Sequence, residues 1–439
     1  MAEALIDDSE IEQDLQDEDV QHINPISNAV NRFVHKVLDI EECAKSSIPQ
    51  AIYAYKKRAK SIDLAFEKNQ NILDGNGTRE EKLVAARELR QALRKSRRFE
   101  LDTSVFTLER SLFIGLFSCF DKFVGELMSA VYKVSPDLYK ALNCQLNVSE
   151  ILCYPSLNEL RDAVLDKEIE TVRRKSYSEQ FKEFERRFGF DTLTKFESWP
   201  KFIESAQRRN LFTHCDGVVS QQYLKACAEV GYKVPKECVV GEQLKINAEY
   251  FFKTCLVVAE VGVMLGQTIW RKMLPEELKN ADSALNALIY DYLQNGDFEK
   301  VISLSKFANG LPKISNEVMS RMFTINHAIA VKNTSGLVSA KKILDRKDWS
   351  ATIHDFKLAR AVLLDEFDLA KDYMLKIGES SELVYEDAYH DWPLFKQFRE
   401  TEQFLEGYEL VYGVKYLAKL SELVSSTQAA AADDAKEVS

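Results

Sequence analysis

Residues 198–217, SWPKFIESAQRRNLFTHCDG, contain the boundary signals of one helix. A proline in the first turn of a helix costs little, because its missing N–H would have no helical partner there. At the other end stands a glycine, the residue that most often follows the last helical turn. We therefore predict a helix that starts at Ser198-Trp199-Pro200 and stops at Asp216-Gly217.

Helical periodicity extends outward from this segment over most of the chain. Apolar residues recur at the spacing of a helix face on both sides of it, and strand signals are scarce. With 16 glycines and 9 prolines in 439 residues, the chain has few of the turns that a β-sandwich or barrel needs. The predicted fold class is therefore all-α. The other predicted helices of the first 275 residues cover 27–45, 48–72, 78–98, 103–134, 157–188 (as one or two helices), 218–231 and 246–273.

The net charge of −11 is concentrated at the two ends of the chain. Residues 1–21 hold nine acidic and no basic side chains, and residues 427–439 hold three acids against one lysine. The residues between them are neutral in sum, so the acidic total does not exclude an RNA substrate. We predict an acidic disordered tail over 1–22 and a second disordered tail over 426–439.

The cysteines and apolar stretches favour a metal-free protein in a reducing compartment. The eight cysteines are irregularly spaced and form no CxxC pair, which is typical neither of a disulfide scaffold nor of a zinc site. The N-terminus is acidic, unlike a signal peptide. Residues 112–120 are too few, and residues 255–270 too interrupted by Glu260, to span a membrane. We expect a cytoplasmic protein with no membrane segment, no metal and no other cofactor.

The motif Arg209-Asn210-Leu211-Phe212-Thr213-His214 combines groups suited to cleaving RNA without a metal. Histidine can remove a proton from a ribose 2′-OH near neutral pH. Arginine can stabilise the extra negative charge on the phosphorus that this oxygen attacks. Arg209 and His214 are five residues apart and so lie about 140° apart around a helix. Three arrangements would bring them together: a reaching arginine, a distorted helix end near Gly217, or a composite site between two copies.

The Arg-polar-x-x-x-His pattern on an all-α scaffold resembles the motif of the HEPN superfamily. Many members are dimeric, metal-independent ribonucleases of antiphage defence, toxin–antitoxin and RNA-processing systems. The resemblance covers roughly 100–275 and implies Arg209 as ligand of the phosphate and the transition state, His214 as general acid/base, and Asn210 as an orienting polar group. A further acidic residue often supports the pair, and Glu109 and Asp121 are both candidates here. The resemblance also implies a homodimer with RNA as substrate.

A basic helix precedes this region. Residues 79–98 carry eight basic and three acidic side chains. Four arginines at i, i+3, i+7 and i+10 share one face of the helix, which fits an RNA phosphate track or a solvated face paired with acids elsewhere. Arg208, beside the motif, is a further candidate for RNA binding. The four arginines are Arg87, Arg90, Arg94 and Arg97.

After Pro275 the predicted helices are shorter and recur as pairs. Residues 297–301 are similar to residues 366–370, two periods of about 34 residues later. This pattern, over about 280–378, weakly resembles tetratricopeptide repeats, which implies a peptide or protein partner.

We predict N-terminal helices over 23–100 that pack on a HEPN-like nuclease domain, 101–278, followed by a TPR-like helix-pair domain, 279–425. The alternative is a non-catalytic helical adaptor with a degenerate HEPN fold.

Overall fold

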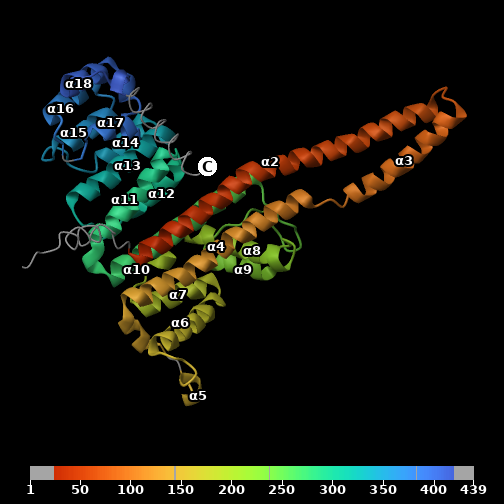
Figure 1. The fold of residues 1–439 in the computed structure, drawn as a ribbon, viewed down its shortest axis with the longest axis horizontal. Helices are drawn as coiled ribbons and strands as arrows, with labels where there is room; N and C mark the ends of the chain where they lie inside the picture. The colour runs from red at the N-terminus through yellow and green to blue at the C-terminus, as the bar shows by residue number, and fades with distance from the viewer. Residues whose placement is uncertain (1–23, 143–144, 237, 382, 420–439) are drawn as a thin grey trace, which may run out of the picture. The chain divides into compact units, whose positions relative to one another are not determined.

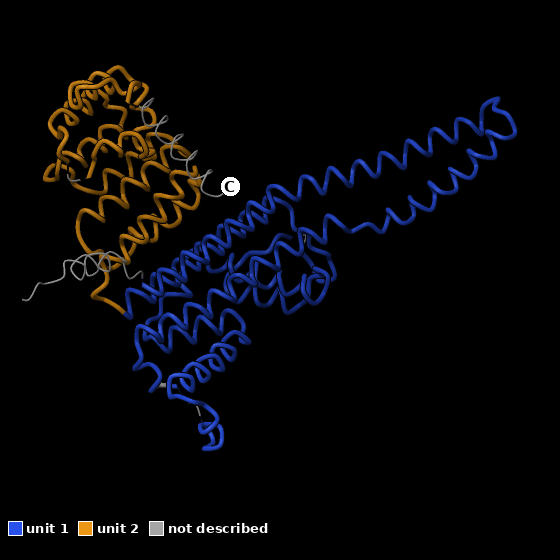
Figure 2. Tube along the Cα trace, in the orientation of Figure 1, with its two compact units in different colours: residues 1–273 blue, residues 274–439 orange. Residues whose placement is uncertain are grey.

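The structure, a computed structural model, describes residues 24–142, 145–236, 238–381 and 383–419. The chain is 77% helix, and no β-strand occurs within these residues, which confirms the all-α prediction. Both predicted tails, 1–22 and 426–439, lie outside the described residues. The chain divides into two compact units after Met273, a few residues before the predicted boundary at 278, and each unit is described by itself (Figure 2).

Unit 1 ends with Met273 and contains the motif (Figure 1). Its helices are α2 (Pro25–Asp74), α3 (Arg79–Phe99), α4 (Ser104–Val134), η1 (Pro136–Ala141), α5 (Val148–Ile151), α6 (Leu157–Arg173), α7 (Tyr177–Phe188), η2 (Leu193–Lys195), α8 (Trp199–His214), α9 (Gln221–Glu229) and α10 (Ala248–Met273).

The first two predicted helices form one continuous helix, α2, so the break predicted between 45 and 48 is wrong. Pro49 lies inside α2 and lacks the N–H that would bond the carbonyl one turn earlier. The helix continues because its first half packs along α4 and α10, where Ala44 and Ile48 are buried just before the proline. This burial outweighs the missing hydrogen bond.

The outer half of α2, residues 49–74, pairs with α3 to form what we call the arm (Figure 1). The capping box predicted at its turn is confirmed: Thr78 N–H donates to Glu81 Oε2 at 2.7 Å, and Glu81 N–H donates to Thr78 Oγ1 at 3.3 Å. The arm buries little, namely Asn69 of α2 and Ala85 and Ala92 of α3. Its surface is therefore almost entirely available to solvent.

The core of unit 1 lies between the inner half of α2 and helices α4, α7, α8 and α10. Phe33 of α2 stacks on Phe123 of α4 with ring centroids 4.5 Å apart. Gly262 of α10 lies under the same ring, and a Cβ there would stand 2.2 Å from Phe33 Cε1. The glycine thus allows α2 and α10 to approach closely.

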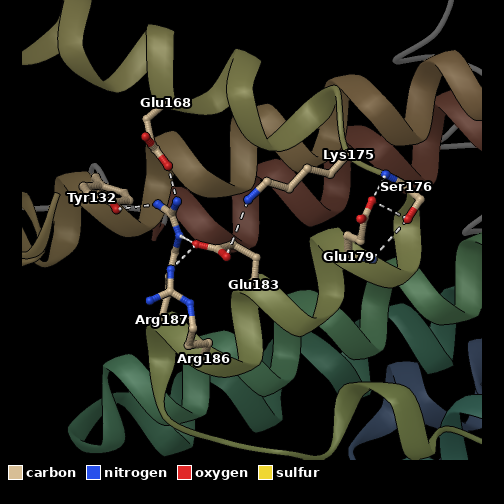
Figure 3. Close-up of polar contacts among 8 residues, drawn as sticks. All are labelled: Tyr132, Glu168, Lys175, Ser176, Glu179, Glu183, Arg186 and Arg187. Atoms are coloured by element: carbon tan, nitrogen blue, oxygen red, sulfur yellow. Dashed lines mark hydrogen bonds and ion pairs between the residues drawn. The ribbon is translucent and has the colours of Figure 1, made fainter. Parts of the chain in front are cut away.

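A network of charged side chains fixes α7 against α4 and α6 (Figure 3). The Arg187 guanidinium donates to Glu168, to Glu183 Oε1 at 2.6 Å and to the Tyr132 hydroxyl at 3.2 Å. Burial alone would raise the pKa of Glu183, but hydrogen bonds from Arg186 and Arg187 lower it to about 2. The network holds the helix whose first residue, Tyr177, reaches the motif.

Among the described residues, α10 is the one helix long and apolar enough to cross a membrane. Of its most apolar window, 72% is buried inside the protein. A core helix of a soluble protein passes the same test of length and composition.

Unit 2 begins with Leu274 and consists of short helices that pack largely as consecutive pairs. The second helices of the first three pairs begin at Phe298, Leu337 and Phe367, so their intervals are unequal. Helix pairing is thus present, and its assignment to tetratricopeptide repeats stays a prediction. The helices are η3 (Pro275–Glu277), α11 (Leu278–Gln294), α12 (Phe298–Asn309), α13 (Glu317–Ser335), α14 (Leu337–Leu344), α15 (His354–Leu363), α16 (Phe367–Ile377), α17 (Glu386–Asp391), η4 (Pro393–Phe395), η5 (Phe398–Glu400) and α18 (Glu402–Tyr412).

Candidate functional site

The motif occupies the second half of α8, and the end of this helix is tightly determined. The N–H groups of Cys215 and Gly217 both donate to the Leu211 carbonyl, at 2.7 and 3.1 Å. Asp216 and Gly217 have positive φ angles of 48° and 81°. A Cβ on Gly217 would stand 2.5 Å from Phe212 Cε1, so glycine is required there by both conformation and space.

Arg209 is held by a short chain of hydrogen bonds. Its Nη2 lies 2.8 Å from Asp121 Oδ2 on α4, and its Nη1 donates to Asn210 Oδ1 at 3.1 Å. The Tyr177 hydroxyl donates to the other Asp121 oxygen at 2.6 Å. Burial, followed by the nearby Asp121 charge, raises the pKa of Tyr177 well above its usual range, so the hydroxyl remains a donor. The guanidinium is therefore oriented, yet 23% of the side chain is exposed.

His214 is the last residue of α8 and is exposed. No hydrogen bond or ion pair joins it to Arg209 within the described residues. Asn210 does contact Arg209, as its predicted orienting role requires. Within the described residues, one chain thus supplies an oriented arginine and an exposed imidazole that no hydrogen bond joins.

The two candidate supporting acids lie in different surroundings. Asp121 contacts Arg209 directly, whereas Glu109 lines a cavity near the start of α4. Burial raises the pKa of Glu109 above its usual range. Asp121 is therefore the acid that the structure brings to the motif.

Arg208 is unsuited to the RNA contact predicted for it, because the structure buries it. Its side chain is 10% exposed, and its Nη2 lies 2.8 Å from Glu204 Oε1. The guanidinium also lies over the Tyr250 ring, 3.8 Å from the centroid. The prediction was wrong because Arg208 lies on a buried face of α8, where Glu204 one turn earlier pairs with it.

Glu204 is a polar residue that the sequence analysis did not single out. It is 2% exposed, and it accepts hydrogen bonds from the hydroxyls of Tyr223 at 2.7 Å and Tyr250 at 2.8 Å besides its pair with Arg208. The i,i+4 spacing of Glu204 and Arg208 was a usable signal. The two tyrosines lie too far along the chain for any local pattern to connect them with it. The network anchors α8 to α9 and α10 beside the motif.

The four arginines of the basic helix all lie on the surface of the arm. Arg87, Arg90, Arg94 and Arg97 are exposed, and within the described part of the chain none forms an ion pair. No acid of the described ranges is thus folded against this face. The phosphate track remains a prediction.

Across the described ranges, no group of three or more His, Cys, Asp or Glu side chains is placed to hold a metal ion.

Comparison with known proteins found no matching family model, and neither a curated protein nor a solved structure matched the chain significantly. The HEPN resemblance therefore depends on the motif and its surroundings alone.

Proposed function

We propose that the protein is a metal-independent endoribonuclease of the HEPN type. The observation that carries the proposal is the Tyr177–Asp121–Arg209–Asn210 chain of hydrogen bonds, which orients a partly exposed guanidinium on the helix that ends in exposed His214. An oriented cation and a free imidazole are the two groups that 2′-OH attack on a phosphate requires.

In this mechanism His214 removes the proton from a ribose 2′-OH, and that oxygen attacks the adjacent phosphorus. The Arg209 guanidinium stabilises the negative charge that develops on the phosphoryl oxygens. The bond to the 5′-oxygen of the next nucleotide then breaks, and this oxygen takes up a proton. The products are a 2′,3′-cyclic phosphate and a 5′-OH end.

The working site is proposed to be composite, formed by two copies of the chain. No hydrogen bond joins Arg209 to His214 within the described part of one copy, so a second copy would supply the missing partner of each. The exposed side of α4 and α8 suits such contact, since Ser111, Ser118 and Thr213 are small and exposed there. A Cβ built on Gly115 meets no atom within 4 Å, so this face is also open.

The biological role proposed from the resemblance is that of a toxin or antiphage defence effector controlled through unit 2. Unit 2 contains a cavity of about 550 Å³ lined by the ends of α11, α13 and α15 and by the residues around η4. Cavities of this size accommodate side chains or small ligands. A peptide or protein partner bound there would be the regulatory input.

A non-catalytic adaptor is the second candidate, and one observation favours it. Asp121 already neutralises Arg209 at 2.8 Å, as in a purely structural ion pair. In that case unit 1 would serve for assembly only, and the exposed His214 would have no chemical role.

RNA cleavage in EDTA separates the two candidates. Wild-type protein is expected to cut RNA with 2′,3′-cyclic phosphate ends, and Arg209→Ala or His214→Ala should each lower the rate at least about a hundredfold. Matched controls are His35→Ala and Arg161→Ala, which remove an exposed histidine and an exposed arginine elsewhere in unit 1. Intact RNA with wild type, with and without a co-expressed partner, would support the adaptor.

A further inference from the structure

A cavity of unit 1 adjoins the end of the motif helix. Its volume is about 730 Å³, within the usual range for small-ligand sites. The outer part of α2, the first turns of α4, Asp216 after α8 and residues 243–247 form its walls. Because Asp216 follows His214 by two residues, a ligand in this cavity would lie next to the proposed site.

Three carboxylates line the cavity, and they differ in how they are paired. Asp102 lies 2.9 Å from Arg58 Nη1, and Asp216 lies 2.6 Å from Arg110 Nη1. Glu109 makes no hydrogen bond or ion pair with any described residue. Burial raises its pKa, the mark of a carboxylate that has lost water without gaining a protein partner. A half-buried acceptor of this kind is left for a ligand that donates hydrogen bonds.

The remaining walls suit a flat, polar ring attached to a phosphate. Tyr55 and Phe106 present aromatic surface to the cavity, and aromatic side chains stack on nucleobases of every type. Lys245 also lines the cavity, is exposed, and has no acidic partner among the described residues. It is therefore available to a phosphate attached to a ring that the cavity encloses.

We propose that this cavity is a guanine-binding subsite and that Glu109 determines its specificity. An ionised carboxylate only accepts hydrogen bonds, through two oxygens side by side. Guanine is the base whose pairing edge offers two adjacent N–H donors, N1–H and the 2-amino group. Adenine and cytosine place a ring acceptor beside their amino group, and uracil places carbonyls on both sides of its single N–H. The inference that this guanine belongs to an RNA substrate depends on the proposed function.

Nucleotide binding to the full chain tests the subsite without requiring catalysis. Titration calorimetry with guanosine, adenosine, cytidine and uridine 5′-monophosphates should show guanosine binding about tenfold more tightly than the others. Glu109→Gln should abolish this preference, because an amide presents only one acceptor oxygen and directs its own N–H groups at the base. Glu100→Gln, an exposed acid near the start of α4, is the matched control and should leave binding unchanged. Equal affinity for all four, or a preference that survives in Glu109→Gln, would overturn the proposal.

Cut-site mapping distinguishes RNA-borne guanine from a free nucleotide. In the expected result, wild type cuts beside guanines, and Glu109→Gln redistributes the cuts over all four bases. Cleavage without guanine preference, together with no selective nucleotide binding, refutes the subsite and leaves the nuclease intact. Selective binding of guanosine monophosphate without any cleavage refutes the nuclease and supports the cavity as a site for the free nucleotide. A melting curve of Glu109→Gln that matches wild type excludes misfolding as the cause.

Discussion

The arginines of α8 and the four aligned arginines of α3 carry the same charge in opposite surroundings. Arg208 and Arg209 each pair with a carboxylate, Glu204 and Asp121, and their side chains are 10% and 23% exposed. The four aligned arginines of α3, Arg87, Arg90, Arg94 and Arg97, are exposed and form no ion pair with the described residues. One set is thus part of the folded framework, whereas the other remains available to an external partner.

This difference separates the contribution of charge to stability from its contribution to binding. A buried ion pair contributes little net stability, but removal of one member leaves an uncompensated charge that is costly. An exposed cation costs almost nothing to remove, and its effect appears only in association with an anion. Substitutions should therefore change the free energy of unfolding in the order in which the side chains are buried.

The largest loss of stability is expected for Arg208→Ala. This change leaves the Glu204 carboxylate, 2% exposed, without its cation and removes the packing against Tyr250. We expect unit 1 to lose about 4 kcal/mol of its free energy of unfolding. Urea denaturation followed by tryptophan fluorescence measures the loss. If Arg209→Ala, whose pair is more exposed, costs as much or more, burial does not set the order.

The Arg187 network should give the next largest effect. Arg187→Ala removes the cation that joins Glu168 to Glu183, and we expect a loss of about 3 kcal/mol at pH 7. The folded pKa of Glu183, about 2, is below its unfolded value. Its contribution is therefore complete above about pH 4.5 and is lost as pH falls toward 2. Urea denaturation across this range should show the wild-type loss and a smaller loss in the variant, where Arg186 and Lys175 still contact Glu183.

Arg186→Ala is the control for this prediction. Arg186 bonds the same Glu183 carboxylate, but its side chain is 72% exposed. Its removal should cost well under 1 kcal/mol. Equal losses for the two variants would mean that the hydrogen bond to Glu183, and not burial of the arginine, sets the effect.

The parts of the fold determined by local chemistry were predictable from the sequence. The capping box at Thr78 and Glu81 and the glycine after α8 act within a few residues, and both boundaries agree with the structure. The continuity of α2 through Pro49 was not predictable, because the packing of α2 on α4 and α10 outweighs the local signal. Residues far apart in the chain supply that packing.

The candidate site likewise has one part that the sequence predicts and another that it does not. The motif could be recognised in the sequence because Arg209, Asn210 and His214 lie within one helix. The choice of Asp121 over Glu109 depends on which turn of α4 faces α8, and Tyr177 comes from a third helix. The burial of Arg208 likewise depends on Tyr250, on α10. Single-sequence patterns contain no information on these contacts.

His327 is buried, and no acid in the described part of the chain forms an ion pair with it. It lies on α13 and is 6% exposed; burial, then the charges of Lys306 and Arg346, lowers its pKa to about 4. Because the unfolded chain binds this proton near pH 6.5, stability is highest above that pH and falls as pH drops toward 4. We expect unit 2 to lose about 2 kcal/mol by pH 5. Hydrogen exchange of α13 should show the loss, and His327→Gln should remove its pH dependence.

The smallest effect on stability, and the largest on salt-dependent binding, is expected for the arm. Changing Arg87, Arg90, Arg94 and Arg97 together to Gln should alter the free energy of unfolding by less than about 0.5 kcal/mol, because all four are exposed and unpaired within the described chain. The slope of log affinity for single-stranded RNA against log salt should decrease by about 0.7 for each phosphate that the variant no longer binds. The control changes four exposed basic residues elsewhere in unit 1, Arg161, Lys167, Lys201 and Lys225, to Gln, and so alters the net charge equally. Equal slopes for the two variants would show that the arm contributes only net charge. The exposed arginines of α3 would then have no specific role in RNA binding.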